Sequence, residues 1–157
     1  MKTLVIYDSV YGNTEKIARA IGDGLSSKSK EVEVVSTGEV NPSELNEHDL
    51  LIVGGPTHGG RPSPDLKEFL DQISKSGLRN LKVSAFDTRT AGENQKLWVR
   101  IITGILGFAA RRIGKILVDK GGELIAEPEG FNVVGREGPL EGGELDRARN
   151  WGSVILD

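Results

Sequence analysis

The chain has 157 residues, a formal net charge of −3 and no cysteine. This length fits one domain with a substantial core, and the negative charge argues against a nucleic-acid-binding protein, which normally carries a basic excess. The lack of cysteine excludes disulfides, thiolate metal sites and thiol nucleophiles, so the chemistry must come from oxygen and nitrogen groups or from a bound cofactor.

The N-terminal apolar run is short. Tyr7-Asp8-Ser9 interrupts it after a few residues, too early for the core of a signal peptide or for a membrane span. We therefore expect a cytoplasmic protein with a single domain over residues 1–157 and no membrane span.

Apolar runs alternate with helical periodicity along the chain. The predicted strands are 3–7, 32–35, 50–55, 81–86 and 123–125, the last with a continuation at 131–134. The predicted helices are 14–25, 65–73, 108–120 and 144–155. Because the run at 50–55 has almost no polar residue, it is typical of a central strand covered on both faces. Such alternation implies parallel strands with right-handed helical crossovers, and so a three-layer, doubly wound α/β fold.

A polar loop, YDSVYGNT (7–14), joins the first predicted strand to the first helix. Ligands of open α/β sheets bind off the carboxyl ends of the strands, where a helix N-terminus offers unpaired N–H groups and a positive dipole end. Ser9, Asn13 and Thr14 add side-chain donors, and Gly12 allows close approach of the backbone. Since the loop lacks Lys and Arg, it suits the single phosphate of a mononucleotide better than a triphosphate. The alternative is a plain polar helix cap.

Two further loops at the same predicted edge are rich in small and hydrogen-bonding residues. They are GGPTHGGRPSPD (54–65) and FDTRTAGENQ (86–95). With these loops the sequence resembles the flavodoxin family over nearly its whole length. SVYGNT resembles the family's phosphate loop, PTHGG its second flavin loop and ELDRARNWG its closing helix, while FDTRT falls at the third flavin loop.

The resemblance implies FMN bound noncovalently at the carboxyl edge of a five-stranded sheet in the order 2-1-3-4-5. It assigns the phosphate to Ser9, Val10, Tyr11, Gly12, Asn13 and Thr14, with Tyr11 acting through its backbone N–H. It assigns one side of the flavin to Pro56, Thr57, His58, Gly59 and Gly60. It assigns the pyrimidine edge to Asp87, Thr88, Arg89 and Thr90. No catalytic or metal-binding residue is expected.

Gly59 and His58 each have two interpretations. If the Gly59 peptide flips, its carbonyl accepts a hydrogen bond from N5–H of the flavin after one-electron reduction, an orientation that glycine adopts at little cost. Alternatively, Gly59-Gly60 forms an ordinary turn. His58 either lies against the flavin or is a surface loop residue.

The sequence also departs from the family pattern. Electron carriers of the family usually stack aromatic rings on both flavin faces, but His58 stands at the expected tryptophan position, and Trp98 is the nearest aromatic candidate near the third loop. The apolar stretch KLWVRIITGIL (96–106) reads as an insert. It is interpreted as a lid over the ring, as a longer buried helix, or as a homodimer contact through residues 97–106.

Residues 79–120 contain nine basic and three acidic residues. Basic residues near the cofactor favour an acidic redox partner, such as a ferredoxin, through electrostatic steering. The alternative is a solvated helix face.

Two functions follow from the resemblance. The first is an FMN-binding redox protein that acts as a low-potential electron carrier between redox partners. The alternative is an FMN-dependent NAD(P)H:quinone oxidoreductase that reduces a small quinone. The missing aromatic residues and the insert favour the reductase, whereas the short chain favours the carrier.

Overall fold

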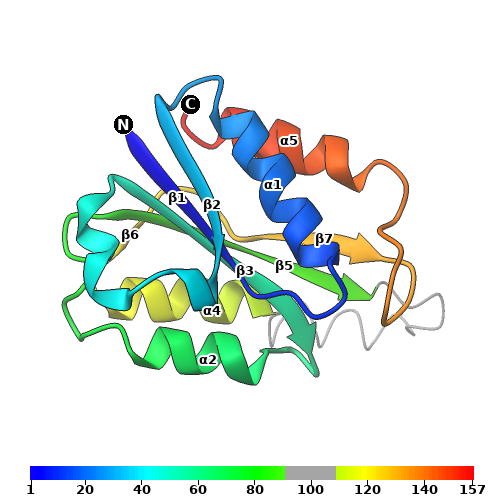
Figure 1. Cartoon of the computed structure of the whole chain (residues 1–157), viewed down its shortest axis with the longest axis horizontal. Helices are drawn as coiled ribbons and strands as arrows, with labels where there is room; N and C mark the ends of the chain where they lie inside the picture. The colour runs from blue at the N-terminus through cyan, green and yellow to red at the C-terminus, as the bar shows by residue number, and fades with distance from the viewer. Residues whose placement is uncertain (91–108) are drawn as a thin grey trace.

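A parallel sheet forms the middle of three layers in the computed structural model, which describes residues 1–90 and 109–157 (Figure 1). Its strand order is β2-β1-β3-β5-β6, with β7 also paired to β5. The strands are β1 (Lys2–Tyr7), β2 (Glu31–Ser36), β3 (Leu50–His58), β4 (Arg61–Pro62), β5 (Lys82–Thr90), β6 (Glu123–Leu124) and β7 (Glu129–Val133). The predicted order 2-1-3-4-5 is confirmed: the fourth predicted strand is β5, and the fifth corresponds to β6 and β7.

The fifth position of the sheet is split between two strands. β6 pairs in parallel with the start of β5, and β7 pairs in parallel with its end. Pro128, just before β7, has no N–H for the ladder, and Ser84 of β5 donates instead to the carbonyl of Ala126 at 3.1 Å. β4 was not predicted, and it adds a short antiparallel hairpin to the end of β3.

Helices cover both faces of the sheet. In Figure 1, α1 (Asn13–Leu25) and α5 (Glu144–Val154) lie on one face, and α2 (Pro64–Asp71) and α4 (Ala109–Asp119) lie on the other. Two short 3₁₀ helices, Thr37–Glu39 and Pro42–Glu47, connect β2 to β3. Among the described residues, no helix is long and apolar enough to span a membrane. The stretch 96–106, with Trp98 and the expected dimer contact at 97–106, lies outside the described residues.

Two separate hydrophobic cores lie on the two faces of the sheet, because successive side chains of a strand point to opposite faces. Along β1, Leu4 and Ile6 pack with α2 and α4, whereas Val5 and Tyr7 pack with α1 and α5. The first six residues of β3 are all buried. This confirms the prediction of a central strand covered on both faces.

Two glycines bring α1 and α5 into close contact. A Cβ on Gly24 would lie 2.0 Å from the carbonyl oxygen of Arg149, and one on Gly152 would lie 2.3 Å from that of Ile21. Only glycine leaves room for this approach of the two backbones. The contact holds the second half of α5 against the second half of α1.

Candidate functional site

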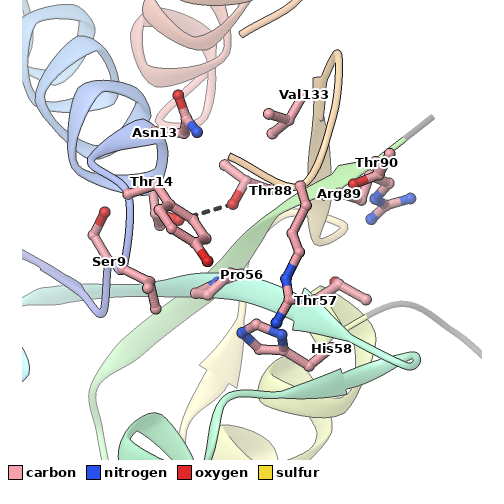
Figure 2. A pocket seen from close by; sticks show the side chains of 13 residues that line it. Ser9, Asn13, Thr14, Pro56, Thr57, His58, Thr88, Arg89, Thr90 and Val133 are labelled. Carbon is pink, nitrogen blue, oxygen red and sulfur yellow. Dashed lines mark hydrogen bonds between the residues drawn. The ribbon is translucent and has the colours of Figure 1, made fainter. Parts of the chain in front are cut away.

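The carboxyl ends of β1, β3, β5 and β7 and the N-terminus of α1 form an open pocket (Figure 2). The pocket is lined by Ser9, Val10, Tyr11, Asn13, Thr14, Pro56, Thr57, His58, Thr88, Arg89, Thr90, Val133 and Arg136. The structure thus brings described residues of the three predicted loops together at one place.

The first loop is held in shape by its own hydrogen bonds. The Ser9 hydroxyl accepts bonds from the backbone N–H groups of Gly12 at 3.1 Å and Glu15 at 3.4 Å. Gly12, the N-cap of α1, has φ +90°, a left-handed conformation that favours glycine. Gly12 does not line the pocket but gives the loop its turn. The N–H groups of Asn13 and Thr14, the first two residues of α1, have no partner within the helix. Such groups suit an anion.

Thr14 and Thr88 join the first loop to the third. Their hydroxyl oxygens lie 2.8 Å apart, and the bond is drawn in Figure 2. Both residues are buried, at 2% and 4% exposure, although both line the pocket. The pair therefore fixes two walls of the pocket in relation to each other.

Asp87 supports the pocket from behind rather than lining it. Its carboxylate is fully buried and accepts bonds from Arg89 Nε at 2.7 Å and Nη2 at 2.8 Å. It also accepts from the N–H of Ala110 at 2.8 Å, and the Thr57 hydroxyl accepts from the N–H of Ala109 at 3.1 Å. Burial raises the pKa of the Asp87 carboxyl, while the Arg89 guanidinium acts in the opposite direction. Asp87 thus holds Arg89 at the pocket wall and fixes the start of α4.

Gly59 and Gly60 form the two-residue turn between β3 and β4. Thr57 pairs with Pro62 and His58 with Arg61, and the two glycines have φ +56° and +80°. Two central residues with positive φ define a type I′ hairpin turn. Neither glycine lines the pocket, and both interpretations of the pair, an ordinary turn and a flavin contact, stay predictions. The peptide flip at Gly59 stays a prediction. His58 is exposed and lines the pocket.

Sequence reasoning missed two lining residues, Val133 and Arg136. Val133 is the last residue of β7, and Arg136 lies in the loop after it. The carboxyl end of β7 lies at the same edge of the sheet as those of the other parallel strands. The sequence GREG (135–138) reads only as a turn. The topological rule that ligands bind at this edge, applied to the last strand as well, would have found them. Within the described parts of the chain, no group of three or more His, Asp or Glu residues could hold a metal ion.

The residues present fit the phosphate and flavin of a mononucleotide. Hydroxyl and amide donors converge with the N-terminus of α1 on one end of the pocket, which suits a phosphate. His58, Pro56 and Thr57 bound the other end. Together with the doubly wound sheet, this donor set defines a mononucleotide-binding α/β protein.

A flavodoxin family model matches residues 5–151, and the chain belongs to the flavodoxin family. It is an FMN-binding redox protein. The resemblance drawn from the loop motifs is thereby confirmed.

Individual relatives carry two kinds of name. The chain is 30% identical to an NAD(P)H dehydrogenase (quinone) of Acidovorax ebreus strain TPSY over 190 positions, which cover 99% of this chain and 95% of the relative. It is 26% identical to a flavodoxin of Clostridium saccharobutylicum over 160 positions, which cover 100% of this chain and 96% of the relative. The crystal structure of oxidised Flavodoxin 2 from Bacillus cereus has a TM-score of 0.75 at 25% identity, covering 99% of this chain and 98% of that one.

Proposed function

We propose that this protein is a low-potential electron carrier that passes electrons between redox partners. The observation that carries the proposal is the size of the chain. The alignment with the Clostridium flavodoxin spans 160 positions, close to the 157 residues of this chain. The alignment with the Acidovorax quinone dehydrogenase spans 190, so that relative carries segments that this chain lacks.

We assign the binding of FMN to the residues of the three loops, within a single domain over residues 1–157. The N–H groups of the α1 N-terminus and the hydroxyls of Ser9 and Thr14 bind the phosphate. His58 lies against the flavin, and Arg89, held by Asp87, places a positive charge at the pyrimidine edge. FMN supplies one-electron and two-electron redox chemistry when bound.

A specific observation favours the quinone reductase as a second candidate. Among the described residues, those that line the proposed flavin end of the pocket include Arg89 and His58 but no carboxylate. Positive charge at the flavin favours the negative charge that accumulates on two-electron reduction. A small quinone would be the acceptor, as the name of the Acidovorax relative suggests.

For the carrier, we propose an acidic redox partner such as a ferredoxin. Arg111, Arg112 and Lys115 are exposed on α4, and α4 begins at the pocket through the bond from Ala109 to Thr57. Basic residues beside the exposed cofactor would steer an acidic surface toward it. A homodimer through residues 97–106 and a cytoplasmic location stay predictions.

The test is the oxidation of NADPH by the FMN-loaded protein with a soluble benzoquinone as acceptor, compared with the same concentration of free FMN. The carrier predicts a rate no greater than that of free FMN, because a carrier exchanges single electrons with redox partners and does not take hydride from NADPH. Turnover of about 10 s⁻¹ or more, typical of enzymes, would overturn the carrier and establish the reductase.

A further inference from the structure

Arg136 lies at the tip of a tight hairpin that follows β7. Val133 and Leu140 form an antiparallel bridge, and the N–H of Val134 donates to the carbonyl of Pro139 at 2.8 Å. The N–H of Gly138 donates to the carbonyl of Gly135 at 3.1 Å, which closes a four-residue turn. Arg136 is the second residue of this turn, so its backbone position is fixed by the bonds on either side.

The same hairpin is attached to the phosphate loop. The side-chain amide of Asn13 donates to the carbonyl of Glu137 at 3.1 Å. Gly138 has φ +103°, and a Cβ there would lie 2.7 Å from the Asn13 side-chain nitrogen. The hairpin backbone therefore rests directly on Asn13. This contact holds the backbone of the hairpin, on which Arg136 lies, beside the start of α1.

The charge of Arg136 is not used elsewhere in the described parts of the chain. Arg136 is exposed and lines the pocket with five residues of the first loop. Across residues 1–90 and 109–157 it has no ion pair, whereas Arg89, the other arginine of the lining, is bound to Asp87. A guanidinium is suited to two-point binding of a phosphate.

We propose that Arg136 binds the phosphate of FMN and adds a positive charge to the neutral donors of the first loop. This inference rests on the proposed FMN site and names a residue that the loop motifs do not contain. The hairpin at 133–140 then acts as a fourth binding loop. Its position is set by the bond from Asn13 to Glu137 and by the close approach of Gly138 to Asn13.

The experiment compares FMN with riboflavin, which has the same ring and side chain but no phosphate. Apoprotein is titrated with each flavin, and binding is followed by the loss of flavin fluorescence. For Arg136→Gln we expect the affinity for FMN to fall about tenfold, the loss typical of a partly exposed bond to a charged group, and the affinity for riboflavin to stay unchanged. Arg136→Lys should keep most of the preference for FMN, because it keeps the charge.

Arg61→Gln is the matched control, since Arg61 is an exposed arginine at the same edge that does not line the pocket. It should leave both affinities as in the wild type. An unchanged ratio of FMN to riboflavin affinity in Arg136→Gln, or an equal loss for both flavins, would overturn the role of Arg136 alone. A wild-type protein that binds neither flavin would overturn the proposed FMN site as well.

Discussion

Ser9 and Thr14 illustrate how single residues prepare the pocket. Both hydroxyls are already bonded within the protein, Ser9 to two N–H groups of its own loop and Thr14 to Thr88. Because these side chains are held in place, little rotamer freedom remains to be lost when a phosphate binds. The entropy of ordering these donors is therefore lost when the protein folds rather than when the phosphate binds.

Replacing Thr14 by Ala should weaken FMN binding by roughly 1 to 3 kcal/mol, since a donor to a charged group is removed. The dissociation constant from a fluorescence titration measures the effect. Ser76→Ala, which removes an exposed hydroxyl outside the pocket lining, should have no effect. Equal affinities for Thr14→Ala and the wild type would show that Thr14 does not contact the phosphate.

Asp87→Asn should lower the free energy of unfolding by about 2 to 4 kcal/mol, because it breaks a buried ion pair and weakens a bond to the start of α4. Urea unfolding measures the loss. Asp71→Asn breaks an exposed pair with Lys67 and should cost less than about 0.5 kcal/mol. If both substitutions cost the same small amount, the supporting role of Asp87 is wrong.

At the scale of elements, helical periodicity predicts the helices. Apolar runs predict β1, β3 and β5, because these strands are buried on both faces of the sheet. The division of the fifth sheet position between β6 and β7 is missed because β6 pairs with β5 through only two residues. A strand of two residues gives no recognisable sequence pattern. β4 is missed for a similar reason. Its two residues gain their structure from the Gly59-Gly60 turn rather than from propensity.

The candidate site is predictable where its residues lie at or just beyond the carboxyl end of a predicted strand. β3 and β5 extend to His58 and Thr90, so Pro56 and Thr88 lie in strands rather than in the predicted loops. Thr14, Pro56 and Thr88 line the pocket as expected. Asp87 was expected at the flavin, but a sequence does not reveal which of two alternating strand residues turns into the protein to meet a helix N-terminus. Arg136 depends on a tertiary contact with Asn13, 123 residues away along the numbering of a 157-residue chain, and has no local signature.

The start of α5 gives a prediction about pH. Glu144 accepts bonds from the N–H of Asn132 at 2.6 Å and from Arg147 Nη2 at 2.7 Å, and the Arg147 guanidinium lowers the pKa of the Glu144 carboxyl. A carboxyl with a lowered pKa in the folded state contributes stability above its unfolded pKa, and this contribution is lost as the pH falls through the folded pKa.

Glu144→Gln should therefore be less stable than the wild type by about 1 to 2 kcal/mol at pH 7. The difference should shrink as the pH falls below about 4.5, the ordinary value of the glutamate carboxyl. Urea unfolding of both proteins between pH 3 and 7 measures it. A difference that is constant over this range would contradict the ionised contact.

At the scale of the molecule, both helical layers contribute to one edge of the sheet. The start of α1 meets the loop before α5 through the bond from Asn13 to Glu137. The start of α4 is bonded to Asp87 and Thr57 of β5 and β3. We propose that the first of these contacts lies at the phosphate and the second at the flavin. The edge of the sheet that carries the candidate site is thus held in place by helices on both faces of the sheet.

The most direct test of the carrier is the stepwise reduction of the FMN-loaded protein by dithionite without oxygen, followed by its visible spectrum. A one-electron carrier predicts reduction in two resolved one-electron steps, with a distinct spectrum after the first. Reduction in a single two-electron step, together with rapid oxidation of NADPH by quinone, would contradict the carrier and support the reductase.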